Sequence, residues 1–289
     1  MKNVIRGILI GVFALLLTVS AGSLIYGQTQ RTQNRQAQEQ ARDLVDIPDS
    51  DIPLAEIPAP PVPGPQISAV PEQPASKPVP EPFGEVRSEV PLDDEHAREL
   101  LKTDLGALRA VNGDVIGWIE IPGTPISYPL LHGTDNQYYL NHNWKKEYNA
   151  GGSIFLEAKN RPDLDNFNTL IYGHRMSDSS MFNSLRHYSG QEYADEHSRI
   201  YVAVEGGVRV YEVFAAMKVT VTDPVYWLIT NQTKYMQKMI DFCLENSVIT
   251  GGSVPEITDR LLTLSTCTGL TTSDDRWVVV AVELVTITE

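Results

Sequence analysis

A proline-rich stretch from residue 48 to residue 91 limits what much of the first third of this chain can fold into. It holds 13 of the 19 prolines, interleaved with acidic and small residues. Such a segment buries too little apolar surface to fold alone, and its prolines favour extended polyproline II. At about 3.1 Å per residue it would reach on the order of 140 Å. We predict a tether over residues 28–91, with residues 28–42 as a short helix or a solvated stretch, and a folded domain over residues 92–289.

The first 27 residues have the pattern of an export segment. Lys2 and Arg6 precede an uncharged, mostly apolar run over residues 7–27, long enough as a helix to span about 30 Å of hydrocarbon. A signal peptide cleaved after Ala21 is the alternative. The run continues to Tyr26, which favours an uncleaved anchor, while three arginines after it blur the charge difference that sets orientation. We predict a single-pass protein of the cell membrane with its domain outside the cell.

The negative charge of the chain is concentrated in one segment. The net charge is −14, and residues 43–95 contain twelve acidic residues against two basic ones, which accounts for −10 of it. An acidic chain is a poor partner for nucleic acid. The rest of the chain is only mildly acidic, so the charge says little about a substrate.

Short runs rich in Val, Ile, Thr and aromatic residues dominate the chain after residue 110 and predict β-strands. Helical stretches are expected at 179–188 and 234–246, and an amphipathic helix over 93–110, where Leu and Ala recur at helical spacing. About eight strands with few helices favour a mainly β fold, a closed or nearly closed barrel. The expected strands are 115–121, 126–130, 153–156, 168–172, 199–204, 208–221, 261–266 and 277–287.

The two cysteines have different sequence contexts. Cys267 follows an apolar strand that ends in small polar residues, so it is expected at the rim of a sheet. Cys243 lies among apolar residues of a predicted helix, where a cysteine behaves as a small hydrophobic core residue. A disulfide between the two is the remaining alternative. Cys267 is therefore the candidate nucleophile.

Two further residues could assist a thiol at that position. His174 follows a predicted strand after one glycine, and imidazole is the usual proton acceptor and donor for a thiol near neutral pH. Arg276 begins the strand after Cys267 and would return beside it if the two strands are antiparallel neighbours. A guanidinium there could stabilise an oxyanion. The alternative for Arg276 is a strand-edge ion pair with Asp274 or Asp275. No metal-binding spacing and no cofactor fingerprint is present.

These residues lie in motifs that resemble the sortase family. Thr263-Leu264-Ser265-Thr266-Cys267 matches the TLxTC signature, and the arginine on the next strand completes it. The segment around His174 is similar to the one that bears the sortase histidine. Class B members in particular are similar in four other stretches: residues 117–119, 138–142, 150–155 and 176–185. The resemblance covers roughly residues 95–287.

The resemblance implies an eight-stranded sortase-type barrel with an N-terminal helix and a helix between strands six and seven. It implies a cysteine transpeptidase with catalytic His174, Cys267 and Arg276, without metal or cofactor. The substrate would be a C-terminal sorting signal of the LPxTG or NPxTN kind on another surface protein, and the acceptor an amine of peptidoglycan or of a pilin. The resemblance further suggests that the peptide groove is lined by Asn136, Leu140, Tyr172 and Ser265.

Several alternatives stay open at this point. Thr268 follows the cysteine where some class B members carry an acidic residue, so the preferred sorting motif cannot be carried over. A secreted cysteine peptidase would share the nucleophile but use water as acceptor. A noncatalytic surface barrel that binds wall or peptide would make Cys267 incidental. For Asn136 and Leu140, a polar turn residue and a core leucine are the alternatives.

Overall fold

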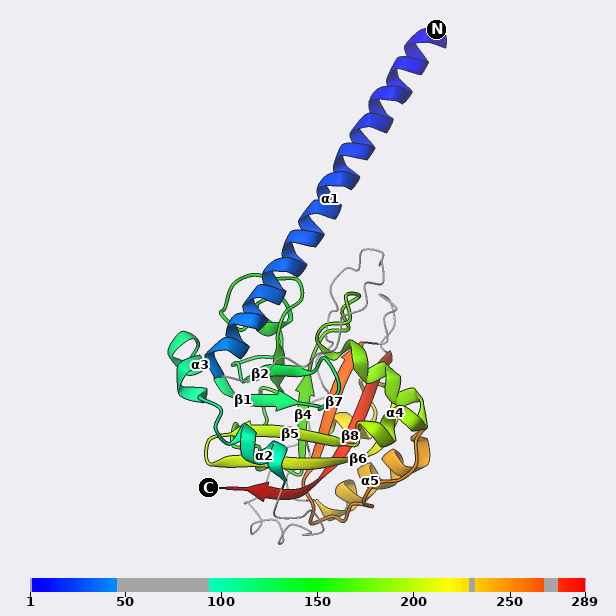
Figure 1. Ribbon diagram of the computed structural model, residues 1–289. Helices are drawn as coiled ribbons and strands as arrows, with labels where there is room; N and C mark the ends of the chain where they lie inside the picture. The colour runs from blue at the N-terminus through cyan, green and yellow to red at the C-terminus, as the bar shows by residue number, and fades with distance from the viewer. Residues whose placement is uncertain (1, 46–93, 229–231, 268–274, 289) are drawn as a thin grey trace.

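The computed structural model describes residues 2–45, 94–228, 232–267 and 275–288. Eight strands close into one barrel in the order β1-β2-β3-β4-β7-β8-β6-β5 (Figure 1). The β2–β3 and β4–β7 pairs are parallel and the other pairs are antiparallel. The strands are β1 Val115–Glu120, β2 Ser127–Leu131, β3 Ile154–Leu156, β4 Asn168–Tyr172, β5 Arg199–Val204, β6 Gly207–Thr220, β7 Leu261–Cys267 and β8 Asp275–Ile287. This confirms the predicted barrel, and each predicted strand end lies within two residues of the observed one.

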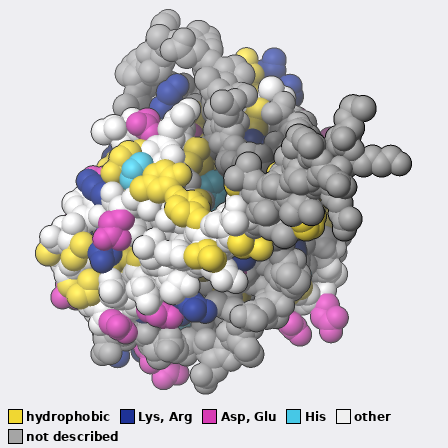
Figure 2. Space-filling model, turned by 90° about the horizontal axis from the view of Figure 1, so that it is seen from above, with side chains coloured by type: hydrophobic (Ala, Val, Ile, Leu, Met, Phe, Trp, Pro, Cys, Tyr) yellow, Lys and Arg dark blue, Asp and Glu magenta, His cyan; other side chains and the backbone are white. Residues whose placement is uncertain are grey.

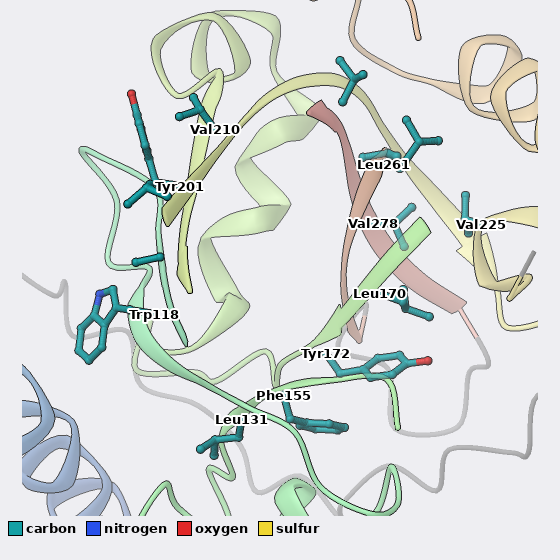
Figure 3. Packing of buried hydrophobic residues seen from close by; sticks show 14 of the residues in the cluster. Trp118, Leu131, Phe155, Leu170, Tyr172, Tyr201, Val210, Val225, Leu261 and Val278 are labelled. Carbon is teal, nitrogen blue, oxygen red and sulfur yellow. The ribbon is translucent and has the colours of Figure 1, made fainter. Parts of the chain in front are cut away.

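The sheet packs on both faces because successive residues of a strand point to opposite sides. On β8, Val278 and Val280 pack with the surrounding helices, whereas Val279 and Ala281 belong to a second cluster shared with η2. Trp118, Tyr172 and Val210 of the first cluster point away from the ring of strands (Figure 3). Strands that are apolar on both faces are expected where both faces are buried.

Helices and 3₁₀ turns cover the barrel. The predicted helix over 234–246 is confirmed as α5 (Thr233–Asn246), between β6 and β7, and the stretch 179–188 forms the 3₁₀ helix η2 (Phe182–Ser189). The single helix predicted over 93–110 is wrong, because the chain forms two short helices there. The Asp104 side chain accepts a hydrogen bond from Ala107 N and so starts a new helix. The remaining elements are α2 Glu95–Leu100, α3 Leu105–Val111, η1 Tyr138–Leu140, α4 Gln191–Glu196 and η3 Pro224–Tyr226.

The long helix α1 (Lys2–Val45) projects from the barrel, and its C-terminal part packs against the domain (Figure 1). Ala37, Ala41 and Val45 are buried in the same cluster as α2 and α3. The sequence assigned residues 28–42 to the tether, but from Gln30 onward this helix contacts the domain. Val45 is buried against the domain, and Asp94 accepts a hydrogen bond from Tyr201 OH at 2.9 Å, so the domain holds both residues that flank the segment 46–93.

The predicted membrane anchor overlaps the N-terminal part of helix α1. Among the residues that it describes, no helix combines the length and the apolar character needed to cross a membrane. The anchor over residues 1–27 stays a prediction.

Candidate active site

Parallel pairing of β4 and β7 brings the predicted histidine and cysteine to one end of the sheet. Tyr172 is the register partner of Ser265, and Gly173 N continues the ladder by donating to Ser265 O at 3.2 Å. His174 follows Gly173, just past the end of β4, and Cys267 is the last residue of β7, two residues beyond Ser265. Parallel neighbours run in the same direction, so residues that follow each strand by a similar number of positions meet at the same edge.

Antiparallel pairing of β7 and β8 brings the arginine back to the cysteine. Cys267 and Arg276 are register partners, as predicted for two strands joined by a short loop. The Arg276 side chain is buried, and its Nη1 donates to the backbone carbonyl of Asp275 at 3.0 Å. The carboxylate of Asp275 itself lies 2.5 Å from Lys218 Nζ. Asp274, the other partner considered for Arg276, lies outside the described residues.

The His174 ring is held by a backbone carbonyl. Its Nε2 lies 2.6 Å from Leu140 O, which assigns the proton of a neutral ring to Nε2, because a carbonyl only accepts. Burial lowers the pKa of His174, and the Leu140 carbonyl partly opposes this shift. On the face seen from the α1 end, hydrophobic and histidine side chains lie next to one another (Figure 2).

A buried carboxylate joins two of the predicted groove residues. Glu157 is 2% exposed, and its Oε2 accepts hydrogen bonds from Tyr172 OH at 2.9 Å and from Asn136 Nδ2 at 2.6 Å. Asn136 Oδ1 in turn accepts from Ala158 N at 2.8 Å. Burial and the neighbouring Glu157 carboxylate raise the pKa of Tyr172. Tyr172 is thus a neutral donor, and both polar atoms of the Asn136 side chain are engaged within the protein.

We expect Glu157→Gln to destabilise the domain by about 1–3 kcal/mol, the cost of unsatisfied buried polar groups. The new amide nitrogen would face a donor in either orientation: Lys159 N at the Oε1 position or Asn136 Nδ2 at the Oε2 position. Urea unfolding measures the free-energy difference. The exposed Glu192→Gln is the matched control, expected within about 0.5 kcal/mol of wild type. Equal stability of both variants would contradict a structural carboxylate at residue 157.

Ser265 is buried beneath a tyrosine of η3. Its Oγ lies 2.7 Å from Tyr226 OH, and its side chain is 3% exposed. Thr263, two residues earlier on the strand, donates to Asn168 Oδ1 at 2.8 Å. The small polar residues of β7 therefore form hydrogen bonds with neighbouring elements.

The predicted site residues thus form one connected region. Asn136 and Tyr172 meet at Glu157, Leu140 holds His174, and Cys267 pairs with Arg276. Glu157 and Tyr226 were not predicted from the sequence. A charged residue directly after the strand 153–156 was the available signal for Glu157. Within the described part of the chain, no group of three His, Cys, Asp or Glu residues is arranged to hold a metal ion.

The second cysteine is a core residue. Cys243 is a free thiol on α5 with no exposed surface, and burial raises its pKa to about 12. A thiol is nucleophilic only as the thiolate. We expect Cys243 to resist iodoacetamide in the native protein at pH 8 and to react once the protein is denatured, with peptide mapping by mass spectrometry as the measurement. Native labelling of Cys243 would contradict the observed burial.

A closed barrel that carries a cysteine and a histidine on the ends of adjacent strands, with an arginine opposite the cysteine, defines a class of thiol-dependent enzyme. Comparison with known protein families identifies this class: the family model described as "Sortase domain" matches residues 119–284. The chain belongs to the sortase family.

The relatives and solved structures agree on the subfamily. Sortase B of Staphylococcus aureus (strain NCTC 8325 / PS 47) is 30% identical over 190 residues, which cover 66% of this chain and 78% of the relative. Sortase B of Listeria monocytogenes serovar 1/2a (strain ATCC BAA-679 / EGD-e) is 36% identical over 169 residues, 58% of this chain and 68% of the relative. The structure of a Staphylococcus aureus sortase B–substrate complex matches with a TM-score of 0.60 and 33% identity, covering 63% of this chain and 85% of that one.

These similarities confirm the predicted family, its class B type and the barrel. They also identify the protein as a cysteine transpeptidase. The alternative of a noncatalytic surface barrel is therefore not supported.

Proposed function

We propose that this protein cleaves the C-terminal sorting signal of other surface proteins after a threonine and joins the acyl group to an amine, with Cys267, His174 and Arg276 as catalytic residues. The observation that carries the proposal is the strand register: β4, β7 and β8 are neighbours, and the three residues lie at the same end of them. A Staphylococcus aureus sortase B–substrate complex among the similar structures supports substrate binding by this chain.

The proposed reaction has two acyl transfers. The Cys267 thiolate attacks the threonine carbonyl, and Arg276 stabilises the oxyanion of the tetrahedral intermediate. The peptide bond after threonine then breaks, and protonated His174 gives its proton to the departing amine, which leaves a thioester on Cys267. An incoming amine attacks the thioester and loses a proton to His174, and the Cys267 thiolate departs. Both transfers balance without an added cofactor.

The four predicted groove residues contribute to the proposal in different ways. Tyr172 and Ser265 lie on adjacent strands next to the catalytic residues, and Leu140 supplies the carbonyl that holds His174. We propose that these three line the peptide site. Asn136 has both polar side-chain atoms engaged, by Glu157 and by Ala158. Its proposed role is to shape the site by fixing Glu157 and, through it, Tyr172.

Location and acceptor are proposals of the same kind. Sortases are cell-surface enzymes, and we propose that residues 1–27 anchor this one in the membrane. The basic residues before the apolar run 7–27 support the anchor. We also propose an acceptor amine from peptidoglycan or a pilin, since substrate, enzyme and lipid-linked wall precursor would then share one surface.

The test is a transpeptidation assay with the full-length chain in detergent. LPxTG-like and NPxTN-like peptides are offered with a triglycine or a diaminopimelate amine, and mass spectrometry identifies the products. A threonyl–amine product that depends on one peptide motif supports the proposal and identifies the motif. Cleavage after threonine with water as acceptor, whichever amine is offered, would favour the peptidase alternative. A scrambled peptide of the same composition is the control.

Arg276→Ala is expected to lower kcat/KM in this assay by about 100- to 1,000-fold, the usual effect of removing one oxyanion donor. Arg276→Lys should retain part of the activity, because lysine keeps the charge but lacks the planar fork of donors. Arg276 is buried, so circular dichroism must first show that each variant is folded. A folded Arg276→Ala enzyme with wild-type kinetics would exclude an oxyanion role.

A further inference from the structure

Residues 138–153 connect helix α1 to the candidate catalytic histidine. On the α1 side, Trp144 Nε1 donates to Ala37 O at 2.5 Å and Asn149 Nδ2 donates to Gln30 O at 2.8 Å. Trp144 and Asn149 are both 1% exposed. Gly151 lies directly against the helix, since a Cβ at this position would come within 2.4 Å of Asn34 Nδ2. The helix therefore contacts this segment through one buried and one partly buried hydrogen bond and through close packing.

The opposite side of the segment holds His174. Leu140 O lies 2.6 Å from His174 Nε2, and Gly152 packs against that same carbonyl. A Cβ on Gly152 would come within 2.7 Å of Leu140 O and 2.5 Å of Tyr139 O. The φ of Gly152 is +59°, in the left-handed region that glycine adopts at little cost. A side chain at position 152 would therefore displace the Leu140 carbonyl, and glycine leaves it in place.

The two sides are joined by a short turn. Gly152 N donates to Asn149 O at 2.9 Å, and Gly151 N donates to Asn149 Oδ1 at 2.9 Å. Ser153 N then donates to Tyr139 O at 2.9 Å, which ties the turn to η1. Asn149 is thus bonded both to α1 and to the residues that pack on Leu140. A displacement of α1 would be transmitted through a few stiff contacts.

We propose that helix α1 positions His174 by holding the segment 138–153, with Asn149, Gly152 and Trp144 as positioning residues. The inference rests on the proposed catalytic role of His174. Helix α1 then orients the His174 ring that transfers the proton, in addition to any role in attaching the domain. Proton transfer needs a heavy-atom separation of about 2.6–3.2 Å, and a misplacement of about 1 Å can cost 100-fold in rate.

Ala37→Glu and Gln36→Glu test this inference as a matched pair in the full-length chain. Ala37 is buried against the domain and Gln36 is exposed, so the same new side chain disturbs docking at one position only. The first readout is the ¹⁵N shifts of the His174 ring, assigned by comparison with His174→Gln. The second is kcat and KM for transpeptidation.

We expect the Nε2–H tautomer in wild type and Gln36→Glu. In Ala37→Glu the ring shifts should change and kcat should fall by about 10- to 100-fold, with KM unchanged. A folded Ala37→Glu enzyme with wild-type shifts and kcat would overturn the inference. The ring shifts do not depend on turnover. If the wild-type protein showed no transpeptidase activity, the proposed function would be wrong, but the ring shifts would still test the positioning of His174.

A second pair covers the case that Ala37→Glu does not fold. Trp144→Phe and Trp118→Phe each remove one buried indole donor, from Ala37 O and from Ser127 Oγ respectively. Only Trp144 lies in the segment between α1 and His174. We expect Trp144→Phe alone to shift the His174 ring signals. Equal shifts in both variants, or none in either, would overturn the inference.

Discussion

Replacing Cys267 with alanine is expected to abolish both the thioacyl-enzyme and the amine-linked product. Removal of a catalytic nucleophile costs on the order of 10⁶ in kcat, which is below detection for a peptide transfer assay. The reason is chemical: without sulfur no acyl intermediate forms, and neither histidine nor arginine can replace it. Intact-protein mass spectrometry after mixing with the sorting peptide measures the acyl adduct directly.

Cys243→Ala is the matched control for this prediction. It removes the other thiol, which is buried on α5 and distant in sequence from the proposed chemistry. This variant should form the adduct and turn over as wild type does, with a loss of stability from the small cavity. An acyl adduct on the Cys267→Ala protein would show that the nucleophile had been assigned to the wrong residue.

The barrel was predictable from the sequence because its strands carry strong local signals. The β8 run of Trp, Val and Leu and the β7 run that ends at Cys267 are bounded by polar residues, so their ends were located within two residues. Pairing was harder. The parallel contact of β4 with β7 joins residues about 95 positions apart, as in the hydrogen bond from Thr263 to Asn168. Local pattern does not encode such a contact, and the pairing of these two strands was not predicted.

The docking of α1 could not be predicted from hydrophobic pattern. Apart from Val45, the buried residues of its C-terminal part are Asn34, Ala37, Gln38 and Ala41, which are small or polar and do not stand out from the Gln-rich stretch around them. Part of the contact is made by backbone carbonyls of the helix, which accept from Trp144 and Asn149. A backbone acceptor is independent of residue type, so the sequence holds little trace of it.

The candidate site shows the same division between local and distant signals. His174, Cys267 and Arg276 each follow or begin a clear strand, and the sequence marked all three. Glu157 was not predicted because the sequence alone does not distinguish a buried carboxylate from a solvated one. The distinction requires its hydrogen-bond donors. Those donors, Asn136 and Tyr172, lie 21 and 15 residues away along the chain. The helix predicted over 93–110 failed for a local reason, since Asp104 was not recognised as a helix cap.

His174→Ala is expected to lower kcat by about 100- to 10,000-fold, the range for loss of a general acid–base group. KM for the sorting peptide should change little, because the ring acts on the proton of the amine. The adduct on Cys267 should still form, but slowly, since the leaving amine would depart without a positioned proton donor. Rapid-quench mass spectrometry separates adduct formation from amine transfer, and both steps should slow because His174 serves in each.

His187→Ala is the control for that experiment, because this exposed histidine lies on η2 outside the proposed site. Its kinetics should match wild type. If His174→Ala slowed only the second step, His174 would be a base for the incoming amine and another group would protonate the leaving one. If neither step slowed, the bond between Nε2 and Leu140 O would be structural, and the proposed catalytic role of His174 would be wrong.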